Sequence, residues 1–244
     1  MAETPGILGI PNRTENWKTA KTLSICIAKK RQHLVAARII ENAGFQARAF
    51  KSSDTVIELF WKGFRDYCKA NDKDSNSSEF IKETSERYRQ LFPDLLWKVQ
   101  QYNRGAPRNR SLRINPANNY ACAHDTESTR TLFDNLRNTE VDIALSAPGF
   151  LLVGEAKSEE AFGADSNHIL PHQLLRQYVM ARVLLETKRF ADIRVIPFIV
   201  GENREQILKC VQVKLLHALG YLNLANVMSW DELSETIPEN ALAS

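Results

Sequence analysis

The spacing of apolar residues predicts that the first hundred residues are mostly helical. Over residues 30–43 the apolar positions recur at helical spacing, which predicts a helix there. Residues 55–70, TVIELFWKGFRDYCKA, open with a Thr55/Glu58 capping-box pattern, and a helix is predicted over them as well. A third helix is predicted over residues 79–92, after a polar linker.

The pattern changes after residue 104, where a stretch rich in Gly, Pro, Asn and Arg predicts a loop as far as residue 119. Helices and strands then alternate, and the predicted order is helix 126–137, strand 141–145, strand 150–156, helix 171–186, strand 193–201, helix 204–219, strand 226–228 and helix 230–235. This order predicts an α/β fold with a mixed central sheet flanked by helices. We therefore expect a helical N-terminal region over residues 1–103, which binds nucleic acid or dimerises, and a core over residues 104–244.

The composition is that of an ordinary globular chain of 244 residues, with 43% hydrophobic and 25% charged residues. No run approaches the ~18 apolar residues that a membrane span needs, and the first residues lack a signal-peptide pattern, so a cytoplasmic location is expected. The four cysteines lie far apart and form no CxxC pair. This spacing argues against a zinc ribbon, and free thiols fit a reducing compartment.

Positive charge is concentrated in two parts of a chain whose net charge is only +3. Residues 1–50 carry eight Lys and Arg against three acids. Residues 104–113 carry no acid and four arginines, namely Arg104, Arg108, Arg110 and Arg113. Such clusters either contact phosphates or form a solvated basic surface.

Charged residues interrupt two strand-like runs in the segment EVDIALSAPGFLLVGEAK, residues 140–157. Residues two apart in a strand share a face, so Glu155 and Lys157 point the same way. If the two strands form a hairpin with an even-numbered loop, Asp142 falls opposite Glu155 on that face. An odd-numbered loop places Asp142 on the other face unless a bulge intervenes. We predict that the three side chains converge.

Two carboxylates and an ammonium at one place suit a magnesium site that acts on phosphate esters. Asp142 and Glu155 offer the oxygen ligands that Mg²⁺ prefers, and the carbonyl of Ala156 is a candidate for a further ligand. The metal would activate a water molecule and neutralise charge on a phosphate in the transition state. Lys157 is expected to orient that water or to stabilise the developing charge.

The segment VDIAL…LLVGEAK resembles the core motif of the PD-(D/E)xK nuclease superfamily, which has the restriction-endonuclease-like fold. In that family an Asp on one strand and a D/E-x-K on the next form the metal site of a phosphodiesterase. Here twelve residues separate Asp142 from Glu155-Ala156-Lys157, a spacing typical of the family, and Val141 replaces the usual Pro. The resemblance spans residues 120–235, so residues 104–244 are interpreted as a nuclease core.

The resemblance also suggests supporting residues on the flanking helices. Many family members place another acid before the Asp strand, and Glu127 is our candidate, with Asp125 and Glu140 as alternatives; a helix N-terminal acid that complements the dipole is the structural alternative. Branches that resemble the RecB-type exonucleases carry a Gln on the helix after the lysine. Gln173 and Gln177 are i,i+4 neighbours, so either one fits this role, and we prefer Gln173.

Two histidines, His168 and His172, flank the same loop. They lack a third ligand at a recognisable spacing, so we interpret them as loop or capping residues.

The resemblance implies a Mg²⁺-dependent DNA endonuclease in which Mn²⁺ substitutes for Mg²⁺. The arginine-rich segment would hold the DNA backbone without reading sequence, and a homodimer is expected. An inactive nucleic-acid-binding module of the same fold and an RNA-directed nuclease are the alternatives.

Overall fold

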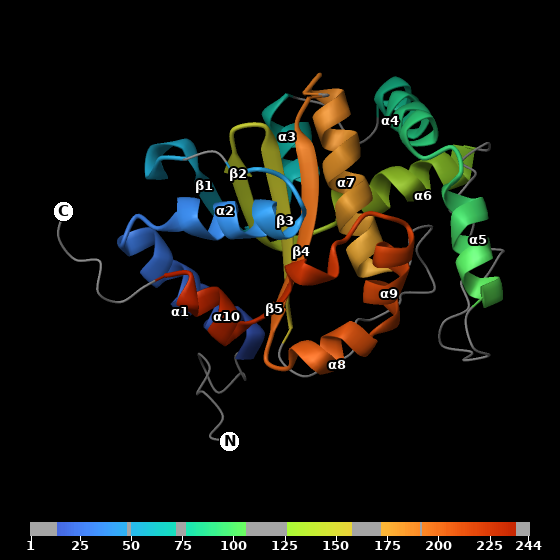
Figure 1. The fold of residues 1–244 in the computed structure, drawn as a ribbon. Coiled ribbons are helices and arrows are strands. Elements are labelled where there is room, and N and C mark those ends of the chain that lie inside the picture. Colours follow the sequence, from blue (N-terminus) through green and yellow to red (C-terminus); the bar gives the residue numbers. More distant parts are fainter. Residues whose placement is uncertain are drawn as a thin grey trace, which may run out of the picture.

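The computed structural model describes residues 14–47, 50–71, 77–105, 126–157, 172–190 and 192–237. This part of the chain is an α/β protein with a five-stranded mixed sheet and ten α-helices (Figure 1). The strands are β1 (Val56–Trp61), β2 (Val141–Ala147), β3 (Phe150–Lys157), β4 (Arg194–Gly201) and β5 (Val227–Ser229). The helices are α1 (Thr14–Ala28), α2 (Gln32–Asn42), α3 (Gly63–Ala70), α4 (Ser78–Leu91), α5 (Leu95–Gly105), α6 (Thr126–Arg137), α7 (Gln173–Thr187), α8 (Arg204–Lys209), α9 (Val211–Ala218) and α10 (Trp230–Glu235).

The strands lie in the sheet in the same order as in the chain, β1-β2-β3-β4-β5. The pairs β1–β2 and β2–β3 are antiparallel, whereas β3–β4 and β4–β5 are parallel. A parallel pair needs a crossover connection, and α7 lies in the connection between β3 and β4. The β2–β3 hairpin therefore lies at the centre of the sheet.

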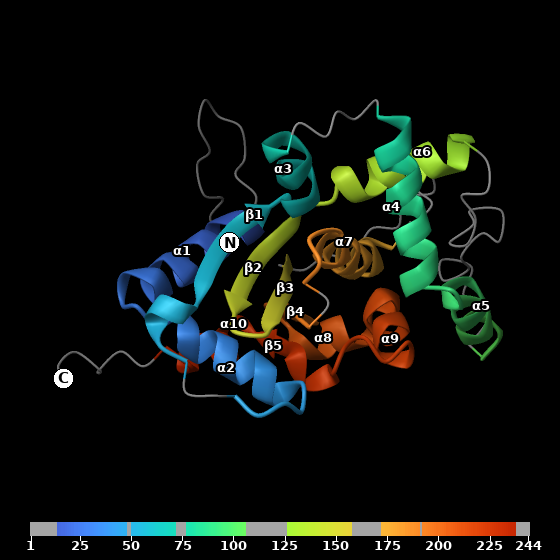
Figure 2. The same ribbon diagram turned by 90° about the horizontal axis from the view of Figure 1, so that it is seen from above.

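Helices cover both faces of the sheet and enclose two hydrophobic clusters (Figures 1 and 2). On one face α1, α2 and α10 pack against residues such as Ile143, Leu152 and Phe198. On the other face α7 packs against the sheet with α3, α4, α6 and α9 around it, over residues such as Val153 and Ile199. A sheet buried on both faces explains why β3 and β4 are near-continuous apolar runs.

The helix predicted over residues 55–70 is wrong in its first half, which is strand β1, and correct in its second half, which is α3. In β1, exposed and half-buried residues alternate from Val56 to Leu59, the period of a strand. β-Branched and aromatic residues dominate this stretch, and its backbone pairs with β2. The Thr55/Glu58 pattern therefore caps no helix, and the N-terminal region contributes a strand to the central sheet.

Most of the other predicted elements are confirmed within two residues at each end, including the helices over 30–43, 79–92 and 126–137. The helix predicted over 204–219 is instead two helices, α8 and α9, because the backbone at Cys210 is extended (φ −63°, ψ 140°). Helices α1 and α5 were not predicted. Across the described ranges, no helix is both long and apolar enough to cross a membrane.

Candidate active site

A two-residue turn sets the register of the β2–β3 hairpin. Ala147 pairs with Phe150 across Pro148-Gly149, and Gly149 has the positive φ (+81°) that a tight turn requires. The ladder continues in step to Ile143 opposite Gly154, so the next position of β2, Asp142, lies opposite Glu155. The even-numbered loop is confirmed, and with it the predicted approach of Asp142 to the D/E-x-K strand.

The side chains of Glu155 and Lys157 lie on the face of the sheet that α7 covers. Leu152 and Ala156 pack into the cluster under α1, α2 and α10, whereas Val153 packs into the cluster under α7. Because side chains alternate along a strand, positions 155 and 157 share the face of position 153.

Asp142 is tied to the β3 backbone by its side chain, because its Oδ2 accepts a hydrogen bond from the N–H of Ala156 at 2.9 Å. The regular pairing of β2 with β3 ends one residue earlier, at Ile143. The carboxylate therefore bonds a backbone group beyond the last regular pair of the ladder, and this contact holds it beside Glu155.

Strand β1, which pairs with β2 on its other side, is distorted opposite Asp142. Phe60 lies opposite Asp142 in the β1–β2 register, and its φ is +56°, in the left-handed region that bulky residues rarely adopt. Backbone strain of this kind costs about 1–3 kcal/mol and persists where the surrounding structure imposes it. The sheet is thus irregular at the level of Asp142.

Glu155 is the centre of the site, a carboxylate with a relative exposure of only 1%. Its Oε1 lies 2.9 Å from the Lys157 Nζ and accepts a hydrogen bond of 2.6 Å from the Gln173 Nε2. Its Oε2 accepts a 2.6 Å hydrogen bond from the Nε2 of Gln177. Gln177 also donates to the backbone carbonyl of Glu140 at 2.9 Å, which fixes the orientation of its amide. Both carboxylate oxygens are therefore hydrogen-bonded, as a buried acid requires.

These contacts do not fully compensate the negative charge of Glu155. Burial and then the neighbouring Asp142 carboxylate raise its pKa from 4.5 to about 8, although Lys157 and Gln177 act in the opposite direction. A buried carboxylate whose pKa is raised by a second carboxylate marks a place where an added cation is favoured.

The donor set fits a magnesium ion, which binds through one or two carboxylates and keeps several of its waters. Asp142 and Glu155 would supply these carboxylates, and a role for the Ala156 carbonyl stays a prediction. Within the described ranges no group of three or more His, Cys, Asp and Glu side chains is placed to hold a metal. A metal at this site would thus depend on two carboxylates together with backbone, water or substrate oxygens.

Most of the remaining predicted site residues have side chains outside the described part of the structure. Glu127 falls in the first turn of α6 and Arg104 near the end of α5, but the side chains of both lie outside the described part of the structure. Arg108, Arg110, Arg113, Asp125 and His168 also lie outside the described residues. The Glu140 carboxylate bonds Lys62 at 2.8 Å and is half-exposed.

His172 precedes α7 as its N-cap residue, and its side chain makes no capping hydrogen bond. Burial, and then the charge of Arg176, lowers its pKa to about 4, so the ring is neutral at pH 7.

Two features of the site were not predicted in full from the sequence. Gln177, the less favoured of the two candidate glutamines, bonds Glu155 as closely as Gln173 does, and the i,i+4 spacing was the signal for both. Gly154, next to Glu155, leaves room for the ring of Phe198: a Cβ at this position would lie 2.2 Å from the Cζ of Phe198. No sequence signal indicated this close approach.

Comparisons with protein-family models, with curated proteins and with solved structures found no match to this chain.

Proposed function

We propose that this protein is a Mg²⁺-dependent nuclease of the restriction-endonuclease-like fold that hydrolyses phosphodiester bonds in DNA, acting as an endonuclease. The observation that supports the proposal is the convergence of Asp142, Glu155 and Lys157 at one end of the central hairpin, with Glu155 buried and its pKa raised. A buried acid–acid–lysine group is unfavourable for stability and typical of sites that bind a cation and a phosphate.

Each residue has a distinct part in the proposed reaction. Asp142 and Glu155 bind the cation, and the hydrogen bond from Ala156 keeps Asp142 in place. Gln173 and Gln177 orient the Glu155 carboxylate, so they are positioning residues. Lys157, with a relative side-chain exposure of 14%, is close enough to the carboxylates to orient a water molecule and to donate to a phosphate oxygen. When bound, Mg²⁺ would supply Lewis-acid stabilisation of the phosphate and lower the pKa of a water molecule.

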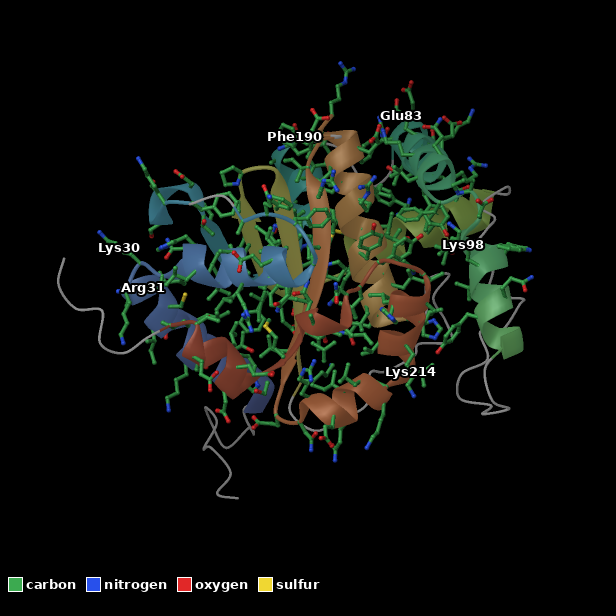
Figure 3. All side chains as sticks on the ribbon, viewed as in Figure 1. Lys30, Arg31, Glu83, Lys98, Phe190 and Lys214 are labelled. Atoms are coloured by element: carbon green, nitrogen blue, oxygen red, sulfur yellow. The ribbon has the colours of Figure 1, made fainter. Side chains whose placement is uncertain are left out.

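The DNA contacts proposed for Arg104, Arg108, Arg110 and Arg113 rest on the sequence alone. The basic turn between α1 and α2 is on a different side of the protein. Lys30 and Arg31 extend outward there (Figure 3), and their helices pack on the face of the sheet opposite α7. Contacts from this turn to DNA at the Glu155 face would thus require DNA that passes around the edge of the sheet, or a second subunit. A homodimer stays part of the proposal, and its test is the mass of the protein in solution.

The decisive experiment is a cleavage assay with supercoiled plasmid, linear duplex, single-stranded DNA and RNA, in Mg²⁺, in Mn²⁺ and in EDTA. We expect metal-dependent nicking of the plasmid by the wild-type chain. Asp142→Asn, Glu155→Gln and Lys157→Met should each lower the rate by at least about a hundredfold, because each removes a group that acts on the reacting phosphate. The Asn at position 142 can still accept the Ala156 hydrogen bond, so its effect reports on charge.

Glu140→Gln and Lys62→Met are the matched controls. They remove the same kinds of charge close to the site, from a half-exposed ion pair, and should retain cleavage. Calorimetric titration with Mg²⁺ gives a second readout, in which Asp142→Asn and Glu155→Gln should weaken binding and Glu140→Gln should not.

Cleavage that survives the Asp142 and Lys157 substitutions would refute the site. Nucleic-acid binding without cleavage would favour the binding module, and cleavage of RNA alone would favour the RNA-directed nuclease.

A further inference from the structure

A second hollow lies at the open edge of β4, separate from the Glu155 site. Strand β5 pairs only with Ile199–Gly201 of β4, so in the described structure the first half of β4 has no strand on that side. The gap is bounded by the segment after α2, the middle of α7, the start of β4 and the segment after α9, which together line a pocket of about 470 Å³. Pockets for small ligands are ~300–1,000 Å³ in volume, so this one is large enough for such a ligand.

The lining of the pocket is positively charged. The two arginines Arg182 of α7 and Arg194 of β4 supply this charge, and no Asp or Glu lines the pocket. No described carboxylate lies within ion-pair distance of Arg182 or Arg194. His217 of α9 also lines the pocket; its Nδ1 lies 3.0 Å from the carbonyl oxygen of Leu222, which can only accept, so Nδ1 carries a proton and Nε2 of the neutral ring is an acceptor for a hydroxyl or amino group. Arginines that pair with no described carboxylate favour an anionic ligand, above all a phosphate.

Two tyrosine hydroxyls add neutral donors beside Arg182. The rings of Tyr178 and Tyr221 stack with centroids 4.4 Å apart and an interplanar angle of 20°. Burial raises the pKa of both hydroxyls, to about 12 for Tyr221, while the charge of Arg182 acts on both in the opposite direction. Tyr178, Arg182 and Tyr221 line the same pocket, and each hydroxyl keeps its proton at neutral pH and can donate it in a hydrogen bond.

The planar guanidinium of Arg194 lines another part of the pocket. The guanidinium of Arg194 lies over the ring of Phe45, with its Cζ 4.7 Å from the ring centroid. The Arg194 side chain is otherwise exposed. A guanidinium that rests on an aromatic ring on one side can stack with a planar ring on its other side, as nucleobases do on arginine.

We propose that this pocket binds a mononucleotide, with the phosphate held by Arg182 and the hydroxyls of Tyr178 and Tyr221 and the base stacked on Arg194. Hydrogen-bond donors for a phosphate and a surface for base stacking occur together in one pocket of suitable volume. The site shares no lining residue with the Asp142–Glu155–Lys157 group, so the proposal does not depend on nuclease activity.

The test is calorimetric titration of the full-length protein with 5′-AMP, ribose 5-phosphate and inorganic phosphate, all in EDTA so that no divalent metal holds a phosphate elsewhere. We expect 5′-AMP to bind with a dissociation constant below about 1 mM, and at least about tenfold more tightly than ribose 5-phosphate. Arg182→Gln should weaken both ligands by about tenfold or more, because it removes a charge-assisted hydrogen bond. Arg194→Gln should reduce the affinity for 5′-AMP towards that for ribose 5-phosphate.

Arg189→Gln is the matched control, because Arg189 is an exposed arginine just beyond α7 that does not line the pocket. It should change the affinity by less than about twofold. Since Arg194 is exposed as well, its substitution tests the pocket even if Arg182→Gln unfolds the chain.

Four results would overturn the proposal. They are absence of 5′-AMP binding below about 1 mM, equal affinity for 5′-AMP and ribose 5-phosphate, an equal loss of affinity in Arg189→Gln, and loss of binding in Asp142→Asn or Lys157→Met.

Discussion

Replacing the Glu155 carboxylate by an amide should make the metal-free protein more stable at neutral pH. Glu155 is buried beside Asp142, and its pKa in the folded protein is about 8 against an ordinary value of 4.5. The folded state therefore holds a proton on this group that the unfolded chain releases as the pH rises above 4.5. The stabilisation is fully present below pH 4.5 and is lost between pH 4.5 and 8.

The size of the effect follows from the pKa difference. In the unfolded chain the Glu155 carboxyl has a pKa of 4.5, so at pH 7 it is 2.5 pH units above its pKa and ionised. In the folded protein the same carboxyl is mostly protonated at pH 7. At 1.36 kcal/mol for each unit, the free energy of unfolding at pH 7 is lowered by about 3 kcal/mol relative to a neutral group. Glu155→Gln should recover part of this, about 1–3 kcal/mol, since the amide has no proton to release but loses the hydrogen bond from Lys157.

The surrounding side chains can accept the amide. Gln177 is fixed by its second bond to the Glu140 carbonyl, so its Nε2 must keep donating to the side-chain oxygen of residue 155. Gln173 can turn its amide so that its oxygen accepts from the new NH₂ group. The substitution thus removes a charge and keeps the contacts to both glutamines, whereas the contact of the Lys157 ammonium to the Oε1 of residue 155 is lost, because an amide NH₂ cannot accept.

The assay is urea or thermal unfolding of both proteins in EDTA from pH 5 to pH 8. A gain of 1–3 kcal/mol corresponds to about 2–12 °C in Tm for a chain of this size. The difference between variant and wild type should grow as the pH rises. Added Mg²⁺ should stabilise the wild type and leave Glu155→Gln unchanged. Glu140→Gln, which removes a half-exposed carboxylate, should shift the free energy of unfolding by less than about 1 kcal/mol at every pH.

The reasoning is refuted if Glu155→Gln is less stable than the wild type at pH 7 in EDTA. It is refuted equally if the difference between the two proteins stays constant from pH 5 to pH 8.

Three further substitutions test the structure around the site. Gly154→Ala should lower the free energy of unfolding by about 1–3 kcal/mol because the new methyl overlaps the Phe198 ring. Adding Phe198→Leu should restore part of the loss. If the two substitutions lower the free energy of unfolding additively, the overlap is not the cause. Gln177→Ala should reduce cleavage about 10–100-fold and move the pH–rate profile to higher pH, since the buried carboxylate loses a donor, whereas an unchanged profile would exclude the positioning role. Phe60→Gly should cost at least about 1 kcal/mol less than Leu59→Gly in urea unfolding, because glycine accepts the positive φ; equal costs would show that the strain is absent.

The local pattern predicted the hairpin that carries the candidate site but left the length of its loop open. Its two strands are joined by two residues, Pro148-Gly149, so the turn length alone fixes which residues face each other. The prediction that Asp142 meets Glu155 therefore rests on counting along one short segment. Helices α6 and α10 were also predicted with the correct bounds.

Features that depend on distant segments were decided only by the tertiary structure. TVIELFW fits a helix by its capping pattern and a strand by its composition, and its pairing with β2, far along the chain, selects the strand. The raised pKa of Glu155 likewise depends on burial under α7, whose effect exceeds the opposing effects of Lys157 and Gln177. The sequence alone determined which chemical groups share the hairpin. Packing between distant segments determined how buried they are, because burial depends on the whole chain and not on any one segment.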